Sequence, residues 1–298
     1  MRDVPLAPRT RWRIGGPAPA FATVHSEDEL RHALDELDGD RVLVLGLGAN
    51  LLVSDEGPGA PVISLDGDFR EFEILQRTIR FGAAVPIAGV VQAARRNDRS
   101  GLWILEAVPG MMGGALRMNA GTAEEGIWER VMWADVMYPD GRTRRVTKDD
   151  VRPSYRAIDL EPSAIFLRAE VSAPPATPED SDQIQEEHLR RRDEKLEAQV
   201  YDLPTCGSTW RNPAPPAPSA WELVAQVGMR GTRVGGAQVS PKHANFIVNL
   251  GDARAQDVVD LMIETRSRVL AETGISLEPE IHFWGFSDDV LSELGVKS

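Results

Sequence analysis

The chain alternates short apolar runs with turn residues and amphipathic stretches, a pattern typical of a mixed α+β protein. Near the N-terminus, residues 20–24 predict a strand, and Ser26 with Glu29 predicts a capping box at the start of a helix. We expect Gly39 to end that helix and the apolar run 42–45 to form a buried strand. The N-terminus is therefore predicted to be a β-α-β unit.

The region up to about residue 175 continues with short apolar or alternating runs separated by turn residues, which predicts a second α+β domain. Strands are expected at 62–65, 78–81, 131–136 and 164–167, and a helix at 87–96.

The pattern changes after this region. Residues 174–178 form a proline-rich linker, and residues 180–199 predict a strongly charged helix, whose charges are usually a solvated face. Residues 257–269 have apolar positions at helical spacing, and Gly274 is expected to close that helix. These changes predict subdomains at 1–65 and 66–199, a C-terminal α+β domain at 200–284 and a tail at 285–298.

The composition narrows the possible functions. A net charge of −13 argues against sequence-independent binding to nucleic acid or anionic lipid, since both require a basic surface. No run is long and apolar enough for a spanning helix, and the first residues lack the apolar core of a signal peptide, so we expect a cytoplasmic protein. The five histidines show no paired ligand spacing, so no metal is expected, and no obligate protein partner is predicted.

Two glycine-rich segments are candidate ligand loops. Residues 46–50, Gly-Leu-Gly-Ala-Asn, follow a predicted strand as a phosphate-binding loop would, although a tight turn has the same composition. Leu51 stands where the dinucleotide fingerprint requires its third glycine, which argues against a Rossmann domain. Residues 110–114 hold three glycines, which would let the backbone approach a flat or phosphorylated ligand, or would form an irregular packed loop.

The most informative stretch begins at the single cysteine, Cys206, and continues as Gly-Ser-Thr-Trp-Arg-Asn-Pro over residues 207–213. It places the hydroxyl of Ser208 on a glycine-flexed turn among polar groups that a core would not need. Cys206 is either a nucleophile or a small packed turn residue, and the sequence shows no base that would activate it.

Four motifs taken together resemble the UDP-N-acetylenolpyruvoylglucosamine reductase (MurB) family in its short form, in matching order and over nearly the whole chain. They lie at residues 13–18, 46–55 and 109–115, and in the pair 207–213 and 235–249. The resemblance implies the FAD-binding fold of the vanillyl-alcohol-oxidase type, with two subdomains around the flavin and a C-terminal α+β substrate-binding domain. It also implies non-covalent FAD, NADPH as hydride donor and a UDP-sugar substrate, the enolpyruvyl precursor of UDP-N-acetylmuramate in peptidoglycan synthesis.

The resemblance assigns roles to individual residues. Arg156 and Glu280 would stabilise the enolate, and Ser208 would donate a proton to C2 of the substrate. Without the family motifs, Arg156 would be interpreted as a surface arginine, Glu280 as a solvated carboxylate and Ser208 as a turn residue. The implied substrate contacts are Tyr155, Lys195, Gln199, Asn212 and His243. The implied cofactor contacts are Gly46, Gly48, Ala49, Asn50, Leu51, Pro109, Gly110, Gly113, Gly114, Asn119 and Gly121.

Some positions depart from the family pattern. Ala157 and Ile158 follow Arg156 where a serine is usual, Lys195 replaces a phosphate-binding arginine, and Val200 replaces a proline. Met111 and Met112 stand in the glycine segment, and for His243 a satisfied, partly buried histidine is an equal alternative to a substrate contact. The competing hypotheses are a related FAD oxidoreductase with another substrate and a non-catalytic paralogue that binds flavin or UDP-sugar.

Overall fold

The computed structural model describes residues 1–37 and 39–296, which divide into two compact units. We name them the central unit, Phe21–Gly46 with Pro61–Lys195, and the C-terminal unit, Met1–Ala20 with Leu47–Ala60 and Leu196–Ser298. Because each unit is assembled from separate segments, neither coincides with a domain predicted from the sequence. The predicted boundaries near residues 65, 199 and 284 stay a prediction.

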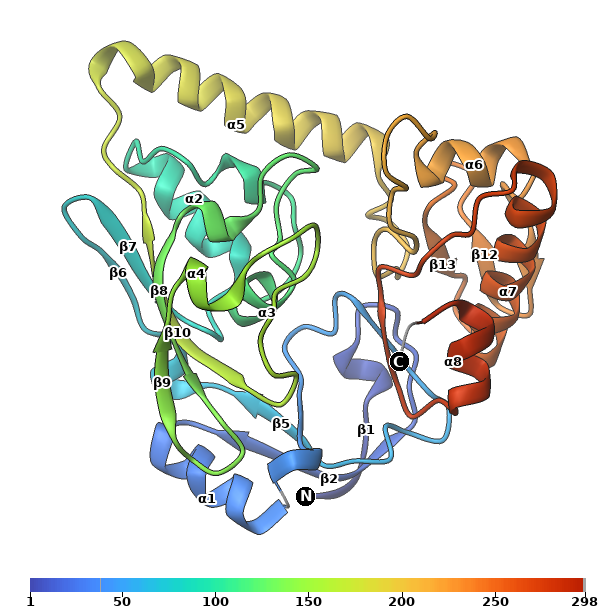
Figure 1. Ribbon diagram of the computed structural model, residues 1–298, viewed down its shortest axis with the longest axis horizontal. Coiled ribbons are helices and arrows are strands. Elements are labelled where there is room, and N and C mark those ends of the chain that lie inside the picture. Colours follow the sequence, from blue (N-terminus) through green and yellow to red (C-terminus); the bar gives the residue numbers. More distant parts are fainter. Residues whose placement is uncertain (38, 297–298) are drawn as a thin grey trace. The chain divides into compact units, whose positions relative to one another are not determined.

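The central unit is built on a five-stranded antiparallel sheet with the strand order β6-β7-β10-β8-β9 (Figure 1). The strands are β6 Phe72–Ile74, β7 Thr78–Gly82, β8 Val131–Met137, β9 Thr143–Val146 and β10 Ile165–Ser172. The strands expected at 78–81, 131–136 and 164–167 are confirmed, and β10 extends beyond its prediction. Their buried residues, such as Phe81, Val136 and Phe166, form one core with the helices beside the sheet.

A smaller parallel arrangement in the central unit confirms the expected β-α-β order. The second half of β2 (Pro17–Val24) and β3 (Leu43–Val44) both pair with β5 (Val62–Leu65), and α1 (Glu27–Leu37) lies between β2 and β3 in sequence. The strand expected at 42–45 is shorter and only half-buried, although its flanks Val42 and Leu45 are buried.

The capping box expected for α1 forms with one change. The Ser26 hydroxyl accepts from the Glu29 N–H at 3.2 Å, as predicted. The Glu29 carboxylate accepts from the His25 N–H at 2.7 Å instead of from Ser26, so the box closes one residue earlier.

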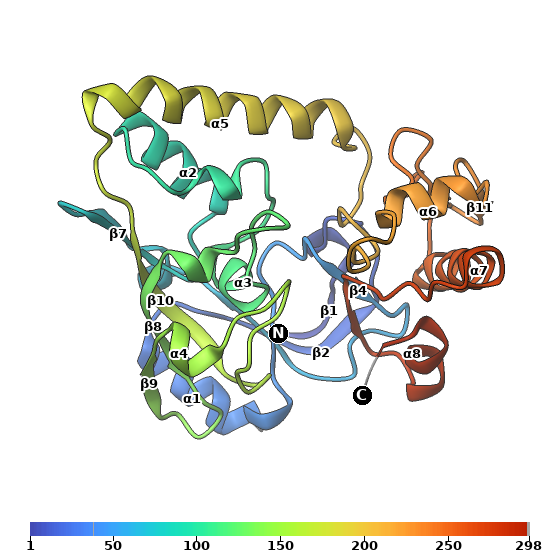
Figure 2. The same cartoon turned by 45° about the horizontal axis from the view of Figure 1, so that its top comes forward.

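The central unit has four more helices: α2 (Ile87–Arg96), α3 (Met112–Arg117), α4 (Lys148–Val151) and α5 (Pro178–Ala198), of which the last continues past Lys195. Helix α2 has its predicted bounds, and the charged helix expected near 180–199 is confirmed as α5. Figures 1 and 2 show α5 lying beside α2, where the Gln185 amide donates to the Arg95 carbonyl at 2.8 Å. The expected loop at 110–114 is wrong in its second half, because α3 begins at Met112.

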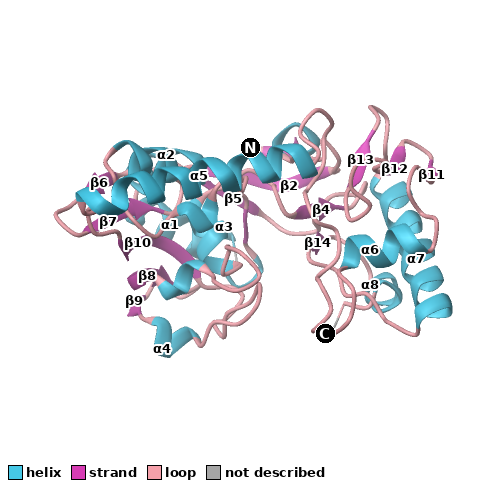
Figure 3. Ribbon diagram, turned by 90° about the horizontal axis from the view of Figure 1, so that it is seen from above, coloured by secondary structure: helices cyan, strands magenta, loops and turns pink. Residues whose placement is uncertain are grey.

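In its described residues, the C-terminal unit combines short strands with three helices (Figure 3). Its buried residues form a core of their own. Strands β11 (Arg233–Val234), β12 (Ala237–Val239) and β13 (Ile247–Asn249) form an antiparallel sheet, β4 (Leu51–Val53) pairs in parallel with β14 (His282–Trp284), and β1 (Arg2–Pro5) pairs with the first half of β2. The helices are α6 (Ala220–Gln226), α7 (Ala255–Thr273) and α8 (Asp288–Leu294). Gly274 caps α7 with a φ of 72°, as expected.

Candidate functional site

Ser208 lies on an extended segment of the C-terminal unit that is hydrogen-bonded on both sides. On one side, Ser208 forms a bridge with Phe246, and the Thr209 N–H donates to the Asn245 carbonyl at 2.8 Å. On the other side, the Glu280 N–H donates to the Thr209 carbonyl at 2.9 Å. Ser208 itself is half-buried, so the fold holds its backbone firmly while leaving the residue partly accessible.

Glu280 is fixed by the same arrangement. Its neighbour Pro279 forms a bridge with Trp210, which is almost completely buried. The Asn50 amide donates to the Glu280 carbonyl at 3.0 Å, and the His282 N–H donates to the Asn50 carbonyl at 3.0 Å. The C-terminal unit therefore brings Ser208, Glu280 and Asn50 together on adjacent, hydrogen-bonded segments.

Cys206 is a packed turn residue, and the nucleophile hypothesis is wrong. Burial raises the pKa of its thiol to about 12, so the thiolate is strongly disfavoured near neutral pH. Its Sγ lies 3.2 Å from the Leu51 carbonyl and 3.7 Å from the Gly48 carbonyl. The cysteine thus packs the Ser208 turn against the segment that holds Gly48, Ala49 and Leu51.

Gly48 has a structural reason to be glycine that is independent of any ligand. Its φ is 53°, and an added Cβ would lie 2.8 Å from the Cα of Thr10. The Gly48 carbonyl also accepts from the Arg11 N–H at 3.1 Å. The tight-turn alternative therefore accounts for Gly48, and a cofactor contact there remains a prediction.

The implied substrate contacts of the C-terminal unit already have partners within the chain. The Gln199 side chain accepts from the Tyr201 hydroxyl at 3.0 Å, and Asn212 Oδ1 accepts from the Ala220 N–H at 3.0 Å, at the start of α6. His243 Nδ1 accepts from the Asn245 N–H at 3.3 Å, and its ring lies edge-on to Phe246.

Burial, and then the charge of Arg230, lower the pKa of His243. A lowered pKa favours the neutral ring, which matches a nitrogen that accepts a hydrogen bond. The structure thus favours the satisfied, partly buried histidine, and the substrate contact remains a prediction.

Arg156 occupies a tight turn of the central unit with a φ of 54°, a conformation that costs an ordinary residue roughly 1–2 kcal/mol. Its guanidinium donates to the Gly121 carbonyl at 3.0 Å and to the Thr122 carbonyl at 3.1 Å, and lies 4.8 Å from the centre of the Tyr155 ring. These hydrogen bonds fix the guanidinium end of the side chain, while the turn fixes its backbone end.

Asn119 and Gly121, which the resemblance assigns to the cofactor, support this turn. The Asn119 amide donates to the Ser154 carbonyl at 2.9 Å and accepts from the Trp128 N–H at 3.2 Å. A Cβ on Gly121 would collide with the carbonyl oxygen of Glu125, so glycine is required by a close backbone approach. Both residues therefore have roles in placing Arg156, which the sequence analysis did not anticipate.

Lys195 lies near Arg156 in the central unit. Its ammonium donates to the Glu106 carbonyl at 2.7 Å. Burial, and then the charges of Arg156 and Arg191, lower the pKa of Lys195 to about 8. The family position that usually carries an arginine thus holds a cation whose charge is sensitive to pH.

The glycine segment ends in the first turn of α3, where Met112 is buried and Gly114 is exposed. Gly113 packs closely, since an added Cβ would lie 3.0 Å from the Cβ of Ala83, whereas an added Cβ on Gly114 would meet nothing within 4 Å. An added Cβ on Gly46 would lie 3.2 Å from the Met111 side chain. Gly114 therefore has no packing reason to be glycine, which fits a close approach by a ligand.

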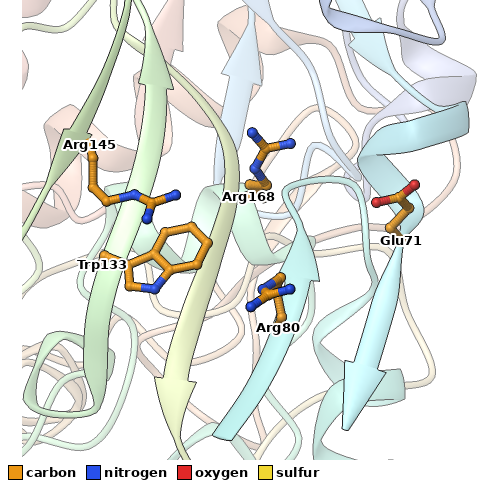
Figure 4. A pocket seen from close by; sticks show the side chains of 5 residues that line it. All are labelled: Glu71, Arg80, Trp133, Arg145 and Arg168. Carbon is orange, nitrogen blue, oxygen red and sulfur yellow. The ribbon is translucent and has the colours of Figure 1, made fainter. Parts of the chain in front are cut away.

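A shallow hollow on the five-stranded sheet gathers arginines but is poorly suited to bind an anion (Figure 4). Arg145 lies 3.7 Å from the centre of the Trp133 ring. Arg145 and Arg168 both pair with Asp135, at 2.8 and 2.9 Å, and Arg80 pairs with Glu170 at 2.8 Å. Because carboxylates already neutralise these guanidinium groups, the hollow is an ion-pair network on the sheet surface.

Residues 199–284 match the MurB_C family, described as "UDP-N-acetylenolpyruvoylglucosamine reductase, C-terminal domain". "UDP-N-acetylenolpyruvoylglucosamine reductase 2" from Symbiobacterium thermophilum is 38% identical, with 95% of this chain and 92% of the relative covered. The reductase from Pelobacter propionicus is 37% identical, with 96% and 95% covered. The chain belongs to the UDP-N-acetylenolpyruvoylglucosamine reductase family.

The fold agrees with this family membership. The crystal structure of UDP-N-acetylenolpyruvylglucosamine reductase (MurB) from Thermus caldophilus has a TM-score of 0.82 and 33% identity, and the match covers 95% of this chain and 98% of the other. The expected α+β fold of the family is therefore confirmed.

The described residues, 1–37 and 39–296, show neither a metal-binding cluster nor a membrane-spanning helix. Among these residues, no group of three or more histidine, cysteine, aspartate and glutamate side chains is arranged to hold a metal ion. Of the helices described, none has the length and apolar character needed to cross a membrane.

Sequence reasoning also missed a buried pair, Glu106 and His188. His188 is completely buried in α5, and its Nδ1 lies 2.7 Å from Glu106 Oε1. The available signal was spacing: His188 and Lys195 are two helical turns apart and therefore share one face of α5.

Proposed function

We propose that this protein uses NADPH and FAD to reduce UDP-N-acetylglucosamine enolpyruvate to UDP-N-acetylmuramate, a cytoplasmic step of peptidoglycan precursor synthesis. The observation that carries the proposal is the pairing of the Ser208 and Glu280 segments in a chain that belongs to the reductase family. A related flavin oxidoreductase acting on an alcohol would have no carbanion for Ser208 to protonate.

The chain's own residues divide the chemistry of the substrate. FAD, when bound, supplies hydride transfer from NADPH to C3 of the enolpyruvyl group. Negative charge then develops on the substrate carboxylate, where a preorganised cation or hydrogen-bond donor lowers the barrier. Arg156 meets that charge, with Glu280 as its partner in stabilising the enolate. The arginine suits this role because it stays protonated and its planar guanidinium can pair with a carboxylate.

Ser208 completes the reaction by donating a proton to C2. A serine hydroxyl is a weak acid, so it acts on a strongly basic carbanion-like centre and regains its proton from water. Accurate placement matters for such a donor, because small displacements lower the rate of proton transfer. The hydrogen bonds on both sides of the Ser208 segment provide that placement.

The glycine segments fit a flavin nucleotide. Gly114 is exposed, and its missing Cβ leaves space that no part of the described chain fills. We assign to FAD the backbone of residues Gly46, Gly48, Ala49, Asn50, Leu51, Pro109, Gly110, Gly113 and Gly114. Asn119 and Gly121 complete the cofactor contacts in this proposal, and they also support the Arg156 turn.

The substrate is an anion that needs local positive charge on a chain with net charge −13. Lys195 supplies that charge for a phosphate, and one of its three N–H donors is engaged by the Glu106 carbonyl. Tyr155, Gln199, Asn212 and His243 complete the substrate contacts in this proposal, and no protein partner is needed.

Spectroscopy of the purified protein tests the proposal. We expect a yellow protein whose colour is released by acid precipitation, bleached by NADPH under anaerobic conditions and restored by the enolpyruvyl sugar. A protein that stays colourless after incubation with FAD would refute the proposed function. A flavin that NADPH reduces but the enolpyruvyl sugar fails to reoxidise would indicate another substrate.

A further inference from the structure

Glu106 and His188 form a buried pair beneath α5. The exposed fraction is 7% for Glu106 and 0% for His188, and Nδ1 of the histidine lies 2.7 Å from Oε1 of the glutamate. A hydrogen bond joins the two groups, and Nδ1 is its donor when Glu106 is an ionised carboxylate, which only accepts. A hydrogen bond to a buried charged group is among the stronger ones in proteins.

The buried pair includes one polar atom in an unfavourable environment. His188 Nε2 is buried and has no hydrogen-bond partner in the part of the chain that the structure describes. A buried polar atom without a partner is costly, and an apolar residue would anchor α5 without that cost. The chemistry of Nδ1 is therefore the reason for a histidine at this position.

Glu106 immediately precedes the segment Ala107–Gly110, which leads into the glycine segment at residues 110–114. Ala107 follows with a φ of 54°, and Gly110 has a φ of 135°. A strained non-glycine residue persists only where its surroundings hold it in place. The far end of the segment is held, since the Ile87 N–H donates to the Gly110 carbonyl at 3.0 Å and the Met112 N–H donates to the Val85 carbonyl at 2.9 Å.

Helix α5 holds the near end through two residues on one face. His188 binds the Glu106 side chain, and Lys195 donates to the Glu106 carbonyl at 2.7 Å. The first of these contacts fixes the side chain and the second fixes the backbone. Together they leave Glu106 little freedom to rotate before the strained Ala107.

We propose that His188 and Glu106 are positioning residues that hold the Ala107–Gly110 turn in the conformation that binds the flavin nucleotide. This inference rests on the proposed function, because that proposal assigns Pro109 and Gly110 to FAD. In this proposal α5 supports the flavin-binding turn through His188, in addition to presenting a charged surface to solvent. Loss of the pair should weaken cofactor binding by more than it weakens the fold.

Three variants of the full chain separate these effects. His188→Leu removes the donor, whereas His188→Asn keeps an N–H near the position of Nδ1. Gln185→Ala is the matched control, because Gln185 anchors the same helix to Arg95 and Asp98 without touching Glu106. For each protein the flavin is removed, the dissociation constant for added FAD is measured by fluorescence titration, and the melting temperature of the apoprotein is recorded.

We expect His188→Leu to raise the FAD dissociation constant about tenfold or more, His188→Asn to recover most of that loss, and Gln185→Ala to change it by less than about threefold. Equal weakening by His188→Leu and Gln185→Ala, in proportion to their melting temperatures, would overturn the inference. So would an unchanged dissociation constant in His188→Leu. Failure of the parent apoprotein to bind FAD would instead refute the proposed function.

Discussion

The Ser208 segment and the Arg156 turn carry two proposed catalytic residues in different ways. Ser208 stands on extended backbone, where neighbouring segments on both sides fix it through main-chain hydrogen bonds. Arg156 stands on a strained turn with a φ of 54°, and side chains such as Asn119 secure that turn. One residue is placed by strand-like pairing and the other by a local side-chain network.

The difference indicates where each site is vulnerable. Backbone pairing survives most side-chain substitutions, so changes at Ser208 should report on chemistry with little effect on placement. The Arg156 turn depends on individual side-chain contacts, so substitutions near it should lower activity without touching the substrate. The comparison therefore predicts that a change at Ser208 affects the chemical step alone. Changes to the side chains around Arg156 should lower activity by displacing that residue.

The largest effect is expected for Ser208→Ala. The variant should fold, bind FAD and accept hydride from NADPH normally, but flavin reoxidation by the enolpyruvyl sugar should be slower by about 10² to 10⁴-fold. Ser208→Cys, which keeps a transferable proton, should recover part of the loss. Anaerobic stopped-flow absorbance measures both half-reactions, and reoxidation of Ser208→Ala at the parental rate would show that the proton comes from another group.

The next effect is expected for Arg156→Lys and Glu280→Gln. Each should slow reoxidation by on the order of 10²-fold and leave reduction by NADPH comparatively intact, because the charge on the substrate carboxylate develops only in the second half-reaction, as hydride reaches C3. The same two half-reactions are compared. Equal damage to both would mean that these residues support the fold or a shared nucleotide pocket.

A smaller effect is expected for Asn119→Ala, which removes one hydrogen bond to the Ser154 carbonyl in the Arg156 turn and one from the Trp128 N–H outside that turn. At about 1 kcal/mol for each bond, we expect roughly tenfold slower reoxidation with nearly normal reduction. Asn97→Ala is a matched control, since the Asn97 amide also bonds to a main-chain carbonyl, that of Ala93 at the end of α2. If both variants lowered the two half-reactions equally, Asn119 would have only a general structural role.

The smallest effect concerns Lys195, whose pKa is lowered to about 8. The lysine is charged below that pH and loses its charge above it, so KM for the enolpyruvyl sugar should rise between pH 7 and 9. Lys195→Arg should flatten this rise, because arginine stays protonated. Parallel KM profiles in the parent and the variant would exclude Lys195 as the phosphate-binding cation.

Sequence patterns predicted the elements whose signals are local. Helix α2 and the closure of α7 at Gly274 agree with expectation, because apolar periodicity and glycine capping are properties of neighbouring residues. The start of α3 at Met112 was not predicted, because Gly113 and Gly114 have low helix propensity. In the folded chain, hydrogen bonds from Met112 and Gly113 to residues 83–85 stabilise this end of the helix.

The candidate site divides along the same line. Family motifs predict Ser208, Glu280 and Arg156 as catalytic residues, whereas the contacts of Asn119 with Ser154 and of Glu106 with His188 join residues 35 and 82 positions apart. Contacts at such separations depend on the folded chain, and neither pair contains a local pattern. Roles of this kind therefore appeared only in the structure.

The central claim is that Arg156 of the central unit and Ser208 of the C-terminal unit serve one half-reaction. Reoxidation rates of Arg156→Lys, Ser208→Ala and the double variant test it directly. Residues that act together are strongly non-additive, so the account predicts that the double variant loses little more than the slower single variant. If the two losses multiplied in the double variant, Arg156 and Ser208 would act independently, which would contradict the account.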